Sequence, residues 1–152
     1  MARIIAVCRS DAKGTKKEPV DEGTLKEGFG LLGDAHADSA GHRQVSLLAV
    51  ESIEKMRALG LNLKPGDFAE NLTTEGIDLL SLAPGTRITI GDGIVLEISQ
   101  IGKECHTGCA IFKQVGKCIM PKEGVFARVI RGGLVKVDDR VMQDRLNDGR
   151  VH

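Results

Sequence analysis

Apolar and polar positions alternate over several short stretches of the chain, and β-branched residues are frequent within them. Alternation of this kind over about four to eight residues is typical of a strand that buries one face. We therefore predict strands at Ile4–Cys8, Val45–Leu48, Arg87–Ile90, Ile94–Gln100, Val125–Arg131 and Leu134–Val137.

One segment has a longer period. Apolar residues recur at every third position from Val50 to Leu59, with Ile53 and Met56 between them, and Gly60 follows. Glycine commonly stands just after the last turn of a helix because it adopts the left-handed conformation at little cost. The pattern predicts a helix from Val50 to about Leu59.

Glycine-rich turns separate several of the predicted strands. The tripeptide Gly-Asp-Gly at 91–93 joins two alternating segments, and the Gly-Gly pair at 132–133 stands between two others. Short loops with glycine are the usual connections of β-hairpins, so both positions predict a hairpin. The polar segment 11–23 predicts a loop after the first strand.

Many short strands, regular turn signals and one clear helix predict a mainly β fold, either a small β-barrel or a strongly bent sheet with a few short helices. The chain has 152 residues, of which 41% are hydrophobic and 28% charged, as in globular domains that fold without metal or disulfide. Because no internal repeat or linker interrupts the pattern, we expect residues 1–152 to form one domain.

The N-terminal residues and the lengths of the apolar runs indicate where in the cell the protein is expected. No apolar run approaches the roughly 18 residues that cross a bilayer, and the first ten residues lack the apolar region and cleavage pattern of a secretory signal. We expect a cytoplasmic protein that does not associate with membranes. Cysteines are usually reduced there, so they are expected to be reactive, metal-bound or buried rather than paired.

The charges of the chain balance, with 21 lysines and arginines against 21 aspartates and glutamates, and the sequence has no tryptophan or tyrosine. Nucleic-acid binding usually needs an excess of basic residues, and binding of single strands also uses aromatic side chains for stacking. We therefore expect no nucleic-acid partner. A local group of basic residues would still suit a small anion.

Three of the four cysteines lie in the stretch GKECHTGCAIFKQVGKC, which runs from Gly102 to Cys118. Cys105, Cys109 and Cys118 with His106 offer four possible zinc ligands. Structural zinc sites usually combine two close pairs of ligands, whereas here one C-x3-C pair precedes a lone cysteine. Cys105 and His106 are neighbours and would point to opposite faces of an extended strand. We therefore expect no tightly bound zinc and keep a structural zinc site as an alternative.

A reactive thiol fits the surroundings of Cys105 better. This residue closes a predicted strand, and Lys103 and His106 are cations close to it in sequence that favour the thiolate. Cys109 shares the loop and is a rival for the same role. Cys8 has apolar neighbours and is expected to pack as a small hydrophobic residue.

Six motifs occur in one order along nearly the whole chain. They read KGTKKEPV, GLLGDAHA, RQVSLLAVESI, PGDFAENLTTEGIDL, PGTRITIGDGIVLEISQIGKECH and MPKEGVFARVIRGG. Each motif is loose by itself. In this order they resemble the MOSC domain, a module found at the C-terminal end of molybdenum cofactor sulfurases and also as small free-standing bacterial proteins.

The resemblance implies a β-rich, barrel-like fold in which a cysteine carries sulfur or ligates molybdenum beside a bound molybdopterin. The family's cysteine follows the strand that here reads IVLEISQIGKEC, which assigns the role, including that of a possible molybdenum ligand, to Cys105. Cys109 is the alternative match a few residues later. Cys118 is a further thiol beyond the expected one and leaves room for a thiol relay.

Molybdopterin carries a phosphate and a polar ring, which guanidinium, imidazole and amide groups bind well. Several candidates also have simpler explanations, namely a solvated Arg43, an Asn71 that caps its own turn, and an Arg128 that faces solvent. The residues expected to bind the cofactor are His36, His42, Arg43, Asn71, Lys103 and Arg128.

We therefore expect a sulfur carrier or a molybdenum cofactor binding protein, with sulfur held as a persulfide on a reactive cysteine. The chain has no lysine motif for pyridoxal phosphate, whose binding is a property of the family only, so it would need a sulfur donor. The expected partners are a cysteine desulfurase or proteins of molybdenum cofactor synthesis. The alternatives are a non-catalytic module for a pterin or another small anion, and the structural zinc protein.

Overall fold

A computed structural model of the chain describes residues 2–10, 17–34, 37, 39–41, 44–58, 60, 65–66, 70–101 and 124–144. Its strands are β1 (Arg3–Arg9), β2 (Glu18–Val20), β3 (Glu22–Lys26), β4 (Gly30–Leu31), β5 (Val45–Ala49), β6 (Leu72–Glu75), β7 (Arg87–Ile90), β8 (Ile94–Ile101), β9 (Val125–Arg131), β10 (Gly133–Lys136) and β11 (Val141–Asp144). The helices are α1 (Val50–Arg57) and the 3-10 turn η1 (Leu79–Ser81). None of the described helices is long and apolar enough to cross a membrane.

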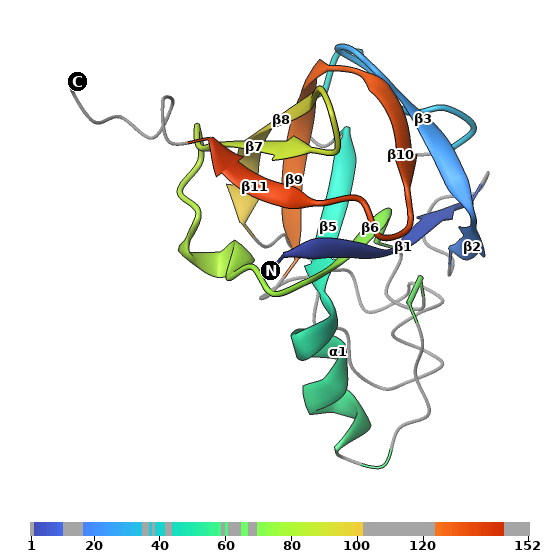
Figure 1. Ribbon diagram of the computed structural model, residues 1–152, viewed down its shortest axis with the longest axis vertical. Helices are drawn as coiled ribbons and strands as arrows, with labels where there is room; N and C mark the ends of the chain where they lie inside the picture. Colours follow the sequence, from blue (N-terminus) through green and yellow to red (C-terminus); the bar gives the residue numbers. More distant parts are fainter. Residues whose placement is uncertain are drawn as a thin grey trace.

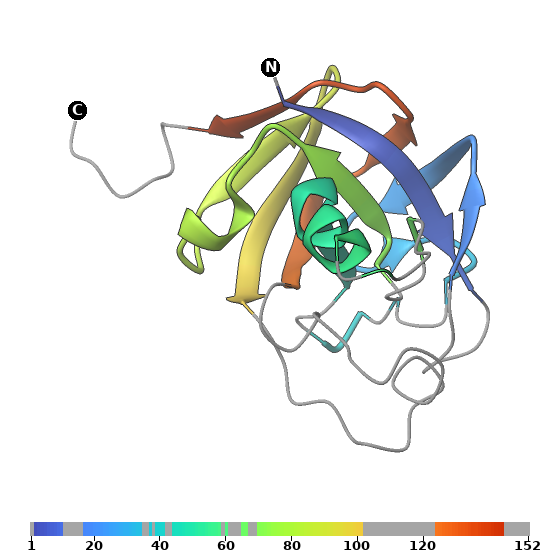
Figure 2. The same ribbon diagram turned by 90° about the horizontal axis from the view of Figure 1, so that it is seen from below.

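The strands form a larger sheet in the order β11-β7-β8-β9-β5-β6-β1-β2 and a smaller one in the order β10-β3-β4 (Figure 1). In the larger sheet β5 and β6 run parallel, and the other neighbouring strands run antiparallel. α1 lies in the connection between β5 and β6, as parallel neighbours require a crossover. Figure 2 shows this helix end-on, beside β5 and β6.

The main core covers one face of the larger sheet, which we call the inner face. Alternate residues of the strands point into it, for example Val45 and Leu47 of β5 and Val125, Ala127 and Val129 of β9. Residues at the positions between them point to the opposite, outer face. The alternation in sequence therefore corresponds to two faces with different neighbours.

The start of β1 lies against the turn that precedes β11, although β1 and β11 are not neighbours in the larger sheet. Ile4 N–H donates to Asp139 O at 2.8 Å, Asp138 N–H donates to Ile4 O at 2.7 Å, and Arg3 forms an isolated bridge with Arg140. The mainly β class is confirmed. The described strands nevertheless form two bent sheets, and a closed barrel is not found among them.

Five of the six predicted strands are confirmed in full, since β1, β5, β7, β8 and β9 cover the expected residues, and β10 covers the sixth except for Val137. The helix begins at Val50 as predicted, and Val50, Ile53 and Met56 are buried. Leu59 lies outside the described residues. The prediction of a loop over 11–23 was wrong in part, because β2 lies within it and pairs with β1.

The predicted hairpin at 91–93 is confirmed, because β7 pairs antiparallel with β8 around it and Gly91 has a φ of 60°. The predicted hairpin at 132–133 is wrong, since β9 pairs with β5 and β8 while β10 pairs with β3 of the smaller sheet. A Cβ on Gly132 would lie 2.2 Å from the carbonyl oxygen of Leu25. Glycine is needed here because the chain crosses closely over β3 as it changes sheets.

Candidate functional site

The outer face of the larger sheet carries a second set of buried residues that are not part of the main core. Cys8, Ser46, Thr73 and Phe126 come from four different strands, and each stands next to a residue that faces the core. The register places Ser46 of β5 opposite Phe126 of β9. Polar and apolar side chains are thus buried together on this face.

Asn71 connects three strands at the centre of this set. Its Oδ1 accepts hydrogen bonds from the N–H of Ser46 at 3.0 Å and from the Ser46 hydroxyl at 3.2 Å, and its Nδ2 donates to the Cys8 carbonyl at 3.1 Å. Cys8 N–H in turn donates to Asn71 O at 2.7 Å. Asn71 is fully buried. Its amide therefore binds β1 and β5 to the residue that precedes β6.

Glu70, which directly precedes Asn71 in the sequence, is also fully buried. One of its carboxylate oxygens accepts a hydrogen bond from the Thr73 hydroxyl at 2.8 Å. A buried carboxylate is costly unless donors surround it, so its position on the outer face marks a specialised environment. The sequence analysis did not single out Glu70, because a glutamate before a strand looks like a solvated residue.

Lys17 and Asp34 form a second buried polar group nearby. The Lys17 ammonium lies 2.5 Å from Asp34 Oδ1, and both side chains are fully buried. Asp34 Oδ1 also accepts from Ser10 N–H at 3.1 Å, and Lys17 N–H donates to the carbonyl of Gly66 at 2.8 Å. Buried ion pairs contribute little net stability compared with apolar packing, but loss of one partner leaves an uncompensated buried charge.

Gly66 links this pair to the Asn71 network. A Cβ on Gly66 would lie 2.2 Å from the Lys17 carbonyl oxygen and 3.2 Å from Cys8 Sγ. Its φ of 91° is in the left-handed region. Only glycine fits this close approach, which brings Lys17 and Cys8 to the same part of the molecule.

These buried residues adjoin the segments in which most of the predicted site residues lie. Asp34 comes two positions before His36, and Gln44 directly follows Arg43. Gln44 is held in place because its Oε1 accepts from Val129 N–H at 3.0 Å. The chain leaves β8 at Ile101, which pairs with Val125 at the start of β9, and Val125 pairs in turn with Leu47 of β5.

Most of the predicted site residues themselves lie outside the described residues. These are Cys105, Cys109, His36, His42, Arg43 and Lys103, together with His106 and Cys118 of the cysteine stretch. Among the residues that the structure does describe, no group of three or more histidine, cysteine, aspartate or glutamate side chains could hold a metal. The predicted thiol and metal chemistry therefore remains a prediction.

Arg128 is described, and its side chain is 50% exposed on the outer face of β9. Its Nη1 lies 3.9 Å from Glu97 Oε1, while Arg87 Nε lies 3.2 Å from Glu97 Oε2. Arg128 follows Phe126 by two positions and so shares its face. The guanidinium is accessible to a ligand, and its ion pair with Glu97 is long.

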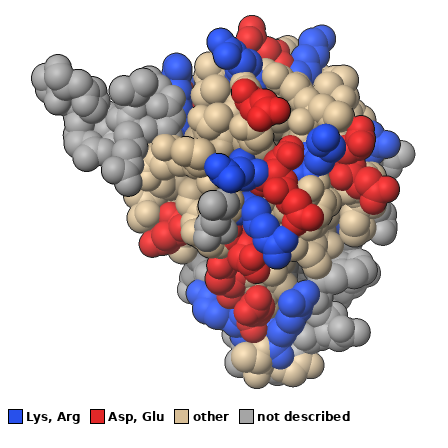
Figure 3. Space-filling model, viewed as in Figure 1, with Lys and Arg blue, Asp and Glu red and all other residues tan. Residues whose placement is uncertain are grey.

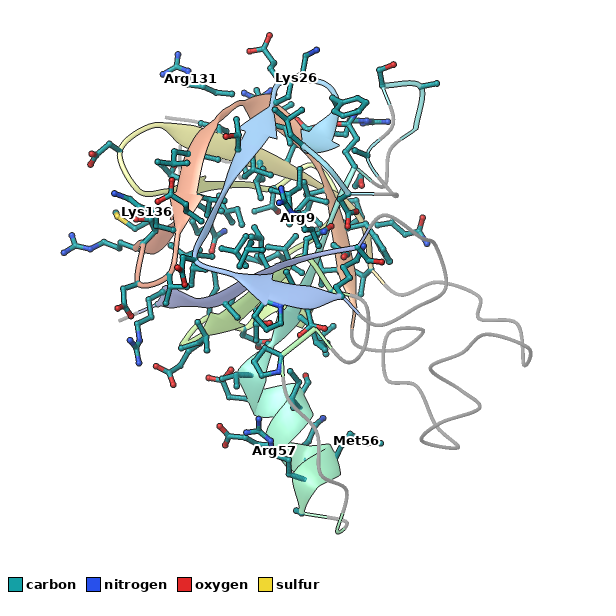
Figure 4. The ribbon with its side chains drawn as sticks, turned by 90° about the vertical axis from the view of Figure 1, so that its right-hand side faces the viewer. Arg9, Lys26, Met56, Arg57, Arg131 and Lys136 are labelled. Carbon is teal, nitrogen blue, oxygen red and sulfur yellow. The ribbon has the colours of Figure 1, made fainter. Side chains whose placement is uncertain are left out.

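Charged side chains of both signs are mixed on the face of the molecule seen in Figure 3. Lysines and arginines alternate with aspartates and glutamates over the face that Figure 3 shows. Lys26 and Arg131 lie at one end of the molecule and Arg57 at the other, on α1, with Lys136 and Arg9 between them (Figure 4). This distribution agrees with the balanced charge of the sequence.

Comparisons with known proteins agree with this fold. The family model of the MOSC domain matches residues 29–142. The YuaD protein of Bacillus subtilis has a similar structure, with a TM-score of 0.77 and 19% identity over 93% of this chain and 94% of that one.

YiiM from Geobacillus stearothermophilus has a TM-score of 0.71 and 17% identity, over 95% of this chain and 76% of that one. YiiM from Escherichia coli has a TM-score of 0.63 and 22% identity, over 98% and 71%. At these identities the likeness concerns the fold alone. No match was found among curated proteins.

Proposed function

The chain belongs to the MOSC domain family, which is associated with molybdenum cofactor-related proteins, and we propose on this premise that it carries sulfur or binds the molybdenum cofactor. Cys105 is the proposed working thiol, with Cys109 as the second candidate. The proposal takes residues 1–152 as one domain that acts in the cytoplasm, where thiols are reduced.

The observation that supports this proposal most directly is the buried polar cluster on the outer face. Asn71, Glu70 and the Lys17–Asp34 pair are buried beside the ends of the segments that carry the predicted cysteine, histidine and arginine residues. A buried ion pair adds little net stability compared with apolar packing, so a role in supporting the neighbouring loops is a reason for the chain to keep it. Such a cluster is a suitable rigid base for loops that perform chemistry.

The described residues are compatible with a molybdopterin site. Most of them would support its loops, and one could contact the cofactor directly. The Asn71 amide and the Lys17 ammonium bond to the protein itself, whereas the half-exposed Arg128 guanidinium can form a paired hydrogen bond with a phosphate. His36, His42, Arg43 and Lys103 would supply further donors to the phosphate and the ring. When bound, the group would supply a molybdenum centre, for which the soft thiolate of Cys105 is a suitable ligand.

The chemistry proposed for Cys105 is the transfer of one sulfur atom. Its thiolate attacks the terminal sulfur of a persulfide on a donor protein, a new S–S bond forms on Cys105, and the donor's thiolate leaves. No net oxidation occurs, because one persulfide replaces another. Lys103 and His106 would stabilise the thiolate. The donor would be a cysteine desulfurase, or the partner a protein of molybdenum cofactor synthesis.

Mass spectrometry of freshly purified, non-reduced protein tests this proposal. We expect one additional sulfur atom on the peptide that contains Cys105 after incubation with a cysteine desulfurase and cysteine, and none on Cys8. The Cys105→Ser variant should lose the added sulfur, and Cys109→Ser should retain it. Sulfur on Cys109 in the wild type would move the assignment to that residue.

A complete absence of added sulfur would contradict sulfur transfer. If Cys105→Ser then binds molybdopterin as the wild type does, while Arg43→Ala and Arg128→Ala do not, the protein is a binding module. Metal analysis in the same samples addresses the remaining alternative, since one zinc per chain would support the structural zinc site.

A further inference from the structure

A cavity of about 480 Å³ lies between the first half of α1 and the segment from Gly76 to Leu80, which follows β6. Cavities of this size are typical of sites for small organic molecules. None of its described lining residues belongs to the predicted thiol or cofactor site. The cavity is therefore a separate place at which a ligand could bind.

Apolar side chains form most of the lining. Ala49 and Ile77 pack against the main core. Leu79 is buried there and fixes η1, whereas the adjacent Leu80 is 43% exposed and lines the cavity. The apolar part of a ligand would cover Leu80 and so remove apolar surface from water. The lining therefore favours a ligand with a hydrocarbon or aromatic body.

Three charged side chains also line the cavity, namely Glu51 and Lys55 of α1 and Asp78 before η1. Glu51 and Lys55 are four positions apart and so share one face of the helix. Glu51 joins the two walls, because its Oε2 accepts a hydrogen bond from Gly76 N–H at 2.9 Å. Two carboxylates stand against one ammonium, so the lining carries an excess of one negative charge.

The Asp78 carboxylate is the group best placed to meet a ligand. Aspartate before a helix commonly accepts a hydrogen bond from the first turn, but the Asp78 side chain does not cap η1. Its backbone carbonyl accepts the Ser81 hydroxyl at 2.8 Å instead. Within the described part of the chain, no donor binds the Asp78 carboxylate. The backbone is thus fixed while the charge stays available.

We propose that this cavity binds a small organic cation, whose charged group pairs with Asp78 and whose apolar body covers Leu80. One excess carboxylate favours a ligand with a single positive charge. A bare metal ion fits poorly, since it needs several oxygen ligands and the lining is mostly apolar. The inference goes beyond the proposed function, and absence of added sulfur on Cys105 would leave it unaffected.

The test is a titration of the full chain followed by the NMR signals of its backbone amides. The probe is benzylamine, which is charged at neutral pH, and benzyl alcohol and benzoate are the neutral and anionic probes with the same ring. We expect benzylamine to shift the amide signals of residues 49–55 and 76–80 in a saturable way. Benzyl alcohol should bind more weakly, and benzoate most weakly of the three.

Two variants separate the charge from the apolar contact. Asp78→Asn should weaken benzylamine binding about two- to fivefold, as expected for an ion pair that solvent still reaches, and leave benzyl alcohol unchanged. Leu80→Ala should weaken both probes by a similar factor. The matched controls are Asp21→Asn and Leu32→Ala, at an exposed aspartate and a leucine that is 40% exposed, both outside the cavity. Both controls should bind as the wild type does.

Four results would overturn the inference. These are the absence of saturable binding, signal shifts centred outside residues 49–55 and 76–80, equal affinity for the three probes, and an Asp78→Asn variant that binds benzylamine as tightly as the wild type. Asp78→Asn is expected to fold, because the Asp78 carboxylate makes no hydrogen bond within the described part of the chain. If it did not, the order of the three probes on the wild type and the effect of Leu80→Ala would still decide.

Discussion

Both faces of the larger sheet bury side chains around β1, β5 and β6, but by different means. The inner face is lined mainly by aliphatic side chains, such as Leu47, Leu72 and Ile98, in one continuous core. On the outer face, hydrogen bonds join Ser46, Asn71 and the backbone of Cys8. The inner face needs only side chains of suitable size, whereas the outer face needs particular donors and acceptors.

This difference separates what the fold requires from what a function requires. Aliphatic cores tolerate many substitutions that keep volume and patterning. Buried polar groups are stable only with their specific partners, and their loss leaves a donor or acceptor unsatisfied. Substitutions on the two faces should therefore differ in how much stability they cost and in which replacement side chain or second substitution restores it.

The largest effect is expected when the buried ion pair is broken. Lys17→Met leaves the Asp34 carboxylate without its ammonium partner in a fully buried position, and removal of one member of such a pair typically costs about 3–5 kcal/mol. Urea unfolding should show this loss. The double variant Lys17→Met/Asp34→Asn removes the unpaired charge and keeps the acceptor for Ser10 N–H, so it should recover much of the stability. No recovery would mean that the pair is not the main constraint.

A smaller but still large effect is expected on the inner face. Leu72 is fully buried in the main core, and Leu→Ala substitutions at such sites cost about 2–5 kcal/mol through lost packing and the cavity they create. Thermal or urea unfolding measures the loss. Leu72→Met keeps the volume and should cost less than about 1.5 kcal/mol. An equal loss in both variants would show that this face is as specific as the outer one.

Asn71→Ala is expected to rank next. It leaves the Ser46 N–H and the Cys8 carbonyl without the amide that now binds them, and each buried polar group left unsatisfied costs about 1–3 kcal/mol. Asn71→Leu restores apolar volume without restoring the bonds, so it should be no more stable than Asn71→Ala. In urea unfolding, recovery by leucine would show that the outer face behaves as an ordinary core.

The inner face could be predicted well from the sequence because alternation reports burial directly. β7 and β9 have the predicted bounds, and β1, β5 and β8 extend by one or two residues. β2 and β4 have three and two residues, too few for a period to be visible. The pair at 132–133 looked like a turn because glycine serves both turns and close crossings, and only the neighbouring β3 distinguishes them.

The buried network of the outer face could not be predicted from the sequence. Lys17 stands in a polar segment, and nothing local indicates that its side chain is fully buried. Its partner Asp34 is far away in sequence, as Ser46 is from Asn71, so the hydrogen bonds depend on the tertiary fold. Asn71 was predicted to bind the cofactor, which stays a prediction, and the contacts observed for it lie within the protein.

The smallest effect should come from two neighbouring threonines of β6 that point to different faces. Thr74 follows Leu72 by two positions and shares the inner face, where its fully buried hydroxyl makes no hydrogen bond among the described residues. Thr73 points outward and donates to Glu70 Oε2 at 2.8 Å. Valine has nearly the shape of threonine and favours strands, so Thr→Val tests the hydroxyl alone.

Thr74→Val should leave stability unchanged or raise it by about 1 kcal/mol, because it removes a buried polar group that has no partner. Thr73→Val should lower stability by about 1.5–3 kcal/mol, since a hydrogen bond to a charged group is lost. Urea unfolding of the two variants under identical conditions measures both changes. Stability changes of opposite sign would confirm that the inner face tolerates loss of a hydroxyl, whereas the outer face depends on its hydrogen bonds. If Thr73→Val proved as neutral as Thr74→Val, Glu70 would not depend on the Thr73 hydroxyl, and the outer network would be smaller than the hydrogen bonds indicate.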